Sequence, residues 1–286
     1  MIFDLDRRYW SVRSQLELHR DVARLGIGAT DLVIDVGSGQ NPHPRANVLC
    51  DLFVRDNTER ASGGGLRVDR PLVVADATRT PFADGTFDFV FCSHLLEHME
   101  DPGALLRELQ RIARAGYIET PSPLYERLYG WRFHRWLVGG DGERLRLEAK
   151  TRDLVDEELH DWFEQRLAEP RFWRAVIPRL RDNGLLTRHV WRDEIDFEII
   201  GQAPSATDGF TSATGEESDG GPVGLGPTVP QRVKSRFAAR ARRRSDRRVQ
   251  EVFESLRCPT CGTGMTVSEG HALCPSCGQR TPVLGI

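Results

Sequence analysis

The sequence lacks three features that would assign the chain to a simple class. None of its apolar runs approaches the roughly 18 residues that a membrane-spanning helix needs. Residues 1–6 lack the basic and apolar stretches of a secretion signal. The 39 basic and 42 acidic residues nearly cancel, to a net charge of −3, which argues against a protein that binds polyanions with its whole surface. We therefore expect a cytoplasmic protein without a membrane span.

Cysteine is also scarce, and its placement is informative. Four of the six cysteines form two Cys-x-x-Cys pairs, Cys258 with Cys261 and Cys274 with Cys277, separated by 12 residues. In a reducing compartment such pairs are metal ligands rather than disulfides. Four thiolates at this spacing fill the tetrahedral sphere of one Zn²⁺, so we predict a structural zinc ribbon that does not need His271.

The clearest motif is an apolar run that ends in glycines, from Leu32 through Asp35 to Gly37, Ser38 and Gly39. It predicts a buried parallel strand that ends in a tight turn, at the sheet edge where ligands bind in α/β proteins. A third glycine is missing, and two prolines within residues 42–44 prevent the helix that would hold a phosphate. The motif therefore favours a nucleoside ligand without phosphates, and its alternative interpretation is a purely structural turn.

Further predicted strands also end in acidic residues. Residues 47–51 end at Asp51, where an acid accepts hydrogen bonds from ribose hydroxyls, and residues 72–76 end at Asp76. The interval between Gly39 and Asp51 is short, so we expect only a turn there, with Asp56 as the second choice for the ribose. The alternative for Asp51 is a surface carboxylate. Strands are also predicted over 87–92 and 116–119, with a helix starting at Pro102 between them.

These motifs together resemble the class I S-adenosylmethionine-dependent methyltransferases, of the type 11-like kind. The matching residues, in order, are Asp35 with Gly37 and Gly39, Asp51, Asp76-Ala77, Pro81 through Asp88, and Leu96-Glu97-His98. The resemblance implies a Rossmann-like α/β fold with a mostly parallel, seven-stranded sheet. Residues 185–192 and 194–200 would close that sheet as an antiparallel hairpin.

The resemblance also implies roles for individual residues. Cofactor contacts fall on the strand ends: Asp35, Gly37, Ser38 and Gly39 at the methionine part, Asp51 at the ribose, Asp76 and Ala77 at the adenine, and Ser93 beside the methyl group. A base for the acceptor would come from His94, Glu119 or His134, in no fixed order. His98 is interpreted as a packing or capping residue.

Residues 1–200 are predicted to form the methyltransferase domain, with an aromatic-rich insertion over 122–150 that roofs the acceptor or forms a satellite core. A hairpin is expected there between 136–138 and 145–147, followed by helices over 152–168 and 171–183. Residues 201–230 have seven glycines and no Lys or Arg, which is typical of a flexible linker. A basic helix over 231–257 and the zinc ribbon over 258–286 complete the chain.

The end of the chain, Pro282-Val283 followed by Gly285-Ile286, resembles the small zinc-ribbon activator subunits that pair with tRNA and protein methyltransferases. We predict that this ribbon docks in cis, with its last strand on an exposed sheet edge. The predicted function is methyl transfer from S-adenosylmethionine to a small-molecule or sugar-containing (glycan) acceptor. RNA or protein methylation, with the basic helix and the zinc ribbon used for recruitment, is the alternative. A non-catalytic binding module is the second alternative.

Overall fold

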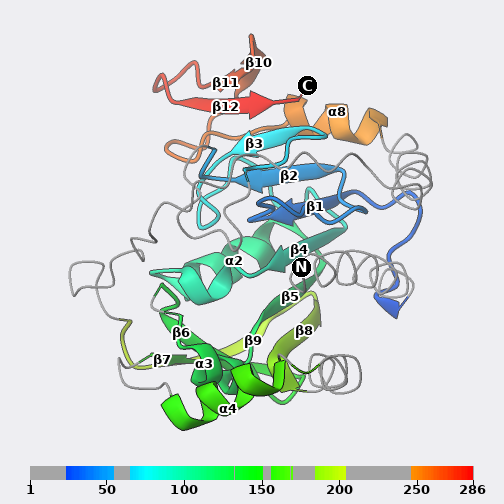
Figure 1. Cartoon of the computed structure of the whole chain (residues 1–286). Helices are drawn as coiled ribbons and strands as arrows, with labels where there is room; N and C mark the ends of the chain where they lie inside the picture. Colours follow the sequence, from blue (N-terminus) through cyan, green and yellow to red (C-terminus); the bar gives the residue numbers. More distant parts are fainter. Residues whose placement is uncertain are drawn as a thin grey trace.

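The computed structural model in Figure 1 describes residues 24–54, 65–131, 133–150, 156–167, 169, 184–203 and 246–285. The fold is α/β and Rossmann-like, as predicted, with helices packed against one large sheet. Within these ranges no helix combines the length and the apolar character that crossing a bilayer requires. Residues 151–155 and 171–183, most of the predicted linker, and the first part of the basic helix, 231–245, lie outside the described residues.

Five parallel strands form the centre of the sheet, in the order β3-β2-β1-β4-β5. They span Val33–Val36 (β1), Val48–Asp51 (β2), Leu72–Val74 (β3), Phe89–Ser93 (β4) and Ala115–Pro121 (β5). Strand β8, Leu186–Arg192, pairs antiparallel with β5. The chain proceeds from β1 outward to β3 and then crosses to β4 on the other side of β1. The strand order therefore reverses between β1 and β4, which is where open α/β sheets bind ligands.

Helix α2, Pro102–Ile112, packs on this sheet through a fully buried apolar stripe that includes Leu105, Leu109 and Ile112. Its start is the one predicted from the sequence. Asp101 caps it by accepting the Ala104 N–H at 2.8 Å, and Pro102 occupies the first turn. A short 3₁₀ helix, η2, over Leu96–His98, connects β4 to this helix and lies beside the strand ends.

A second, three-stranded sheet corrects one prediction. It contains β6 (Trp136–Gly140), β7 (Arg144–Ala149) and β9 (Asp196–Ile200), with helices α3 (Pro123–Tyr129) and α4 (Glu157–Leu167) beside it. The predicted 136–147 hairpin is present, but β9 pairs parallel with β7. The predicted hairpin of 185–192 with 194–200 is therefore wrong. Asp193 has a left-handed φ of 63° and turns the chain away, so residues 1–200 contribute six described strands to the main sheet, not seven.

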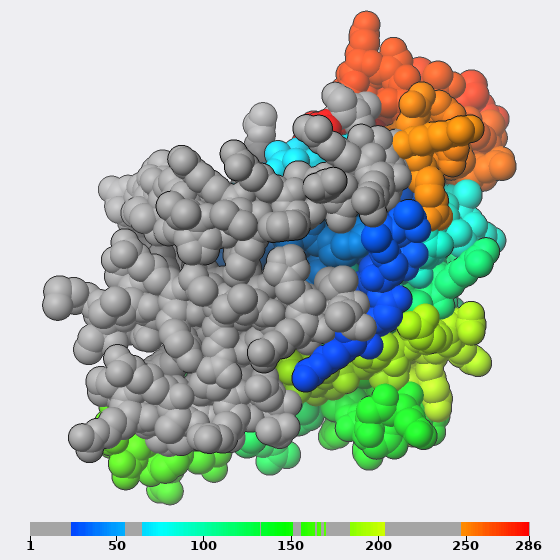
Figure 2. All heavy atoms as spheres, turned by 90° about the vertical axis from the view of Figure 1, so that its right-hand side faces the viewer, coloured from blue at the N-terminus to red at the C-terminus, as the bar shows by residue number. Residues whose placement is uncertain are grey.

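The C-terminal segment joins the main sheet at its β3 edge. It forms helix α8 (Asp246–Glu254) and strands β10 (Thr266–Ser268), β11 (His271–Leu273) and β12 (Arg280–Leu284). Strand β12 pairs antiparallel with β3, placing Val283 opposite Val73 and extending the sheet to nine strands. Figure 2 shows these residues, in orange and red, gathered at one end of the molecule. Val252 and Leu256 are buried in the same apolar core as the sheet.

Candidate active site

The turn after β1 is shaped by two glycines in the left-handed region. Gly37 has a φ of 73°, and a Cβ atom there would lie 2.9 Å from the Leu95 side chain. Gly39 has a φ of 52°, and among the described residues, its chain neighbours aside, no atom lies closer than 3.9 Å to the position of its missing Cβ. No helix occurs between β1 and β2, as the prolines predicted. The turn therefore offers an open backbone surface rather than the phosphate-binding end of a helix.

Two polar groups of this turn bear on cofactor binding. Asp51, at the end of β2, accepts the Gly39 N–H at 2.9 Å and the Phe53 N–H at 3.0 Å, so its carboxylate faces the glycine turn. The Ser38 Oγ is buried and has no hydrogen-bond partner among the described residues. A buried hydroxyl without a partner is costly, which fits a surface that receives a polar ligand. Asp56, the second choice for the ribose, lies outside the described residues.

Asp35 is the most perturbed acid of the group. Its carboxylate is buried on β1 and accepts the His43 N–H at 2.6 Å. Burial raises the pKa of Asp35 to about 7, against the lowering effects of that hydrogen bond and of Arg70. A cationic group placed beside Asp35 would favour the charged carboxylate and bring its pKa down. The chemistry of this position thus fits the ammonium group of an amino acid.

The third strand end carries the other predicted acid. Asp76 follows β3, and its Oδ1 accepts the Thr78 N–H at 2.8 Å and the Thr78 hydroxyl at 2.7 Å. Ala77 is partly buried and packs on the central core. Because β1, β2 and β3 are neighbours in the sheet, the acids of all three strands lie along one carboxyl edge. The residues predicted to hold the methionine, ribose and adenine parts are therefore brought together in that order.

His94 and Glu119 also come together, at the ends of β4 and β5. Ser93 is opposite Glu119 in the sheet register, and His94 Nε2 lies 3.7 Å from Glu119 Oε1. Glu119 already accepts from the Tyr117 hydroxyl at 2.6 Å and from Arg188 at 3.0 Å. The His94 side chain is 49 % exposed, whereas that of Glu119 is 14 % exposed. His94 is therefore the more accessible base of this pair.

His134 occupies a different position. Its side chain is buried in the insertion, where Nδ1 contacts Glu126, and Lys150 Nζ donates to the other Glu126 oxygen at 2.7 Å. Burial lowers the pKa of His134 although Glu126 works in the opposite direction. His134 thus belongs to a second group of side chains, which neighbours the His94 pair through Glu97. The sequence showed no local signal for Glu126 or Lys150, because no motif links these distant positions.

The aromatic residues of the insertion pack largely against one another. The rings of Tyr129 and Trp131 stack with centroids 5.2 Å apart, and Tyr125 meets Trp131 edge-on at 4.8 Å. Phe163 of α4 contacts the same cluster at 6.1 Å from Tyr129. These contacts fit the satellite core that was the alternative to a roof over the acceptor. The insertion nevertheless begins close to the strand ends, because the Arg135 N–H donates to the Glu97 carbonyl at 2.7 Å.

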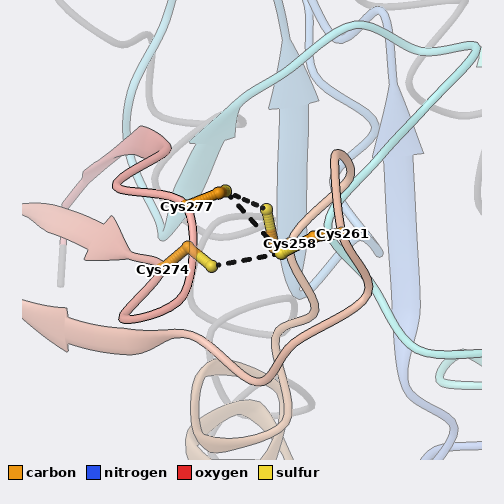
Figure 3. A group of neighbouring side chains, drawn as sticks. All are labelled: Cys258, Cys261, Cys274 and Cys277. Carbon is orange, nitrogen blue, oxygen red and sulfur yellow. Dashed lines mark hydrogen bonds between the residues drawn. The ribbon is translucent and has the colours of Figure 1, made fainter.

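The four paired cysteines converge from two loops, as Figure 3 shows. The Cys258 and Cys277 sulfurs lie 3.5 Å apart, as do those of Cys261 and Cys274, and all four lie within 4.8 Å of one another. Tetrahedral Zn–S bonds of about 2.3 Å imply sulfur–sulfur separations of about 3.8 Å. The donor set and its dimensions therefore fit a Zn²⁺ ion with four thiolate ligands.

Comparison with known proteins agrees with this geometry. A family model described as a methyltransferase domain matches residues 35–118, which run from β1 to β5. The demethylmenaquinone methyltransferase of Beutenbergia cavernae is 28% identical over 211 residues, 66% of this chain and 88% of that protein. A ubiquinone/menaquinone biosynthesis C-methyltransferase of Desulfotalea psychrophila is 31% identical over 38% of this chain and 49% of its own.

Among solved structures, a methyltransferase from Aquifex aeolicus matches 37% of this chain and 64% of its own, with 18% identity and a TM-score of 0.29. The matched family region covers the glycine turn and the strand-end residues Asp51, Asp76 and His94, and it ends one residue before Glu119. The chain carries a methyltransferase domain. It is an S-adenosylmethionine-dependent methyltransferase.

Proposed function

We propose that this enzyme transfers the methyl group of S-adenosylmethionine to a small-molecule acceptor. The observation that carries the proposal is the row of Asp35, Asp51 and Asp76 along one sheet edge, next to an accessible His94. The bound cofactor supplies an electrophilic methyl on a sulfonium. The site residues would align an acceptor with that methyl group, so that the carbon–sulfur bond would break as the bond to the acceptor forms, and a base of the site would take up the acceptor's proton.

The proposed cofactor contacts follow the order of the strands. Gly37, Ser38 and Gly39 would face the methionine part, with Asp35 at its ammonium group. Asp51 would accept from the ribose hydroxyls after releasing the Gly39 N–H, and Asp76 with Ala77 would face the adenine. What supports these assignments is the open glycine turn and the Ser38 hydroxyl, which has no hydrogen-bond partner in the described part of the chain. Ser93 would border the methyl group from the end of β4.

We propose His94 as the base. Its imidazole is half exposed at the end of β4, and Glu119 at 3.7 Å would orient it and stabilise its protonated form. Glu119 is a weaker candidate because Tyr117 and Arg188 both donate to its Oε2, and its Oε1 lies beside His94. His134 is also weaker, because its buried contact with Glu126 keeps it from an acceptor.

The acceptor we favour is an aromatic hydroxyl compound such as a reduced quinone. What supports this choice is the naming of relatives as demethylmenaquinone methyltransferases, at modest identity. In such an acceptor a base that removes the hydroxyl proton makes the adjacent ring carbon nucleophilic, which is a role that His94 could fill. A sugar-containing acceptor has no comparable support.

We further propose that Cys258, Cys261, Cys274 and Cys277 hold one structural Zn²⁺ and that the ribbon stays docked in cis. The 3.5 Å sulfur–sulfur separations support the metal, and the pairing of β12 with β3 supports the docking. Arg248 of α8 also donates to Asp88 at 2.5 Å, so part of the positive charge of this helix is neutralised by an acidic residue of the same chain. This placement favours docking over recruitment of RNA. The proposed boundaries are 1–200, 201–230, 231–257 and 258–286, with the insertion at 122–150.

The decisive experiment is an assay of S-adenosylhomocysteine formation by the full chain. We expect product with reduced demethylmenaquinone and none with transfer RNA or a protein extract. The His94→Ala variant should lose roughly 10²–10⁴-fold in kcat if His94 is the base. The matched control, His160→Ala, removes a histidine of α4 that contacts the Leu128 carbonyl and the Tyr129 ring, and it should keep full activity. Methylation of RNA but not of the quinol would contradict the acceptor proposal.

A further inference from the structure

A second group of side chains of the types that bind metals lies next to His94 of the proposed active site, apart from the four cysteines of the ribbon. Glu97 and His98 come from η2, and His134 comes from the insertion before β6. One ligand atom from each residue lies within 4.8 Å of the other two. The rings of His98 and His134 meet edge-on with centroids 4.6 Å apart. Two segments distant in sequence therefore place two imidazoles and a carboxylate around one point.

Glu97 is the reason to look for a ligand here. Its side chain is 1 % exposed, and its Oε1 lies 3.4 Å from His94 Nδ1 and 4.0 Å from His98 Nε2. Neither carboxylate oxygen makes a hydrogen bond of good geometry within the described residues. The protein thus buries a carboxylate without the well-formed hydrogen bonds that such a group normally needs. A cation bound between the three side chains would balance that charge.

The surroundings of His134 resemble those of a metal ligand. A histidine that binds a metal usually gives its other ring nitrogen to a carboxylate, which fixes the ring and raises its basicity. His134 Nδ1 contacts Glu126 in this way, and Lys150 holds the second Glu126 oxygen at 2.7 Å. This contact leaves Nε2 of His134 for the ion. The Glu126–Lys150 pair is neutral overall, so it orients His134 without adding net charge to the site.

We propose that Glu97, His98 and His134 bind a divalent transition-metal ion, of the class that takes two imidazoles and one carboxylate. Zn²⁺ and Co²⁺ both accept this donor set. Three protein ligands leave at least one coordination position for water or another group. The proposal does not depend on the acceptor or on the cysteine ribbon.

The test measures metal content and cobalt spectra on the full chain. After equilibration with Zn²⁺ and gel filtration, we expect about two ions per chain in the unmodified protein and about one in Glu97→Gln or His98→Gln. His160→Gln, the matched control, should keep two. Loss of the second ion from that control as well would overturn the assignment.

A further variant distinguishes metal bound at this site from metal bound by the four cysteines of the ribbon. Cys258→Ser should retain one Co²⁺ whose spectrum lacks the intense sulfur-to-cobalt absorption of thiolate sites. This measurement does not require the Glu97 or His98 variants to fold. A Cys258→Ser chain that retains no cobalt, or retains it only with thiolate absorption, would show that Glu97, His98 and His134 form a charge network without a metal.

Discussion

At the scale of single residues, the site depends on groups held in costly states. Asp35 is a buried acid whose pKa is raised to about 7 by desolvation, and His94 is a non-glycine residue with a φ of 54°. Strained backbone conformations and buried acids each lower the free energy of unfolding, and both are frequent at functional sites. Both lie at the strand ends that the sequence motifs identified, so each suggests its own measurement.

The first prediction concerns the proton on Asp35. At pH 6 the free enzyme should hold Asp35 mostly protonated, because its pKa is about 7. If Asp35 meets the cofactor's ammonium group, binding favours the carboxylate and releases close to one proton per chain. The release should fall toward zero above pH 8, where Asp35 is already ionised, and affinity should rise between pH 5.5 and 7.5.

Titration calorimetry with S-adenosylhomocysteine, in buffers of different ionisation enthalpy, measures this proton count. Asp35→Asn should abolish the release, whereas Asp196→Asn, at an exposed position on β9, should leave it intact. Equal proton release in Asp35→Asn and the unmodified enzyme would remove Asp35 from the ammonium site.

The second prediction separates strain from chemistry at His94. A left-handed backbone costs an alanine about 1 kcal/mol more than a glycine. His94→Gly should therefore be more stable than His94→Ala by about that amount, which corresponds to about 2–4 °C in melting temperature for a protein of this size. Both variants should lose methyl transfer equally, because both lack the imidazole. Calorimetry compares the stabilities, and equal melting temperatures would indicate that the φ of 54° carries no strain.

At the scale of elements, the sequence predicted what short-range patterns determine. The buried strands, the turn without a helix after β1, and the Asp101–Pro102 helix start all follow from local chemistry, and all are present. The partner of β9 was predicted wrongly. The alternating pattern of residues 194–200 does not specify a partner strand, and in the structure the chain turns at Asp193 and β9 pairs with β7. Pairing of this kind depends on distant residues, so periodicity alone does not settle it.

The residues of the candidate site likewise fall into those that local motifs predict and those that they do not. The strand-end acids were predictable because a motif of adjacent residues carries each one. The group of Glu126, His134 and Lys150 was not, because its members meet only after the insertion folds onto η2. His98 was interpreted as a packing residue, and its ring does stack on Phe133 with centroids 5.5 Å apart. The same ring also faces Glu97 and His134, a relation that spacing along the chain cannot reveal.

At the scale of the whole molecule, the C-terminal segment completes the sheet. Without β12, the β3 edge would present unpaired backbone groups at Leu72 and Val73, whose side chains are fully buried here. Without α8, the apolar surface that Val252 and Leu256 cover would face water. The catalytic region therefore relies on residues more than 170 positions later in the chain for part of its core, as the pairing of Val73 with Val283 illustrates.

The last prediction tests this reliance with a chain that ends at residue 203. Burial of large aliphatic side chains contributes about 1.5–3 kcal/mol each, so loss of α8 and β12 should lower the melting temperature by at least several degrees and reduce solubility.

A milder variant, Leu256→Ala in the full chain, should lower the free energy of unfolding by about 2–5 kcal/mol, because Leu256 is 1% exposed. Gln250→Ala, an exposed position on the same helix, is its control. An unchanged melting temperature in the shortened chain, together with loss of salt-sensitive RNA binding, would instead indicate a ribbon that serves recruitment.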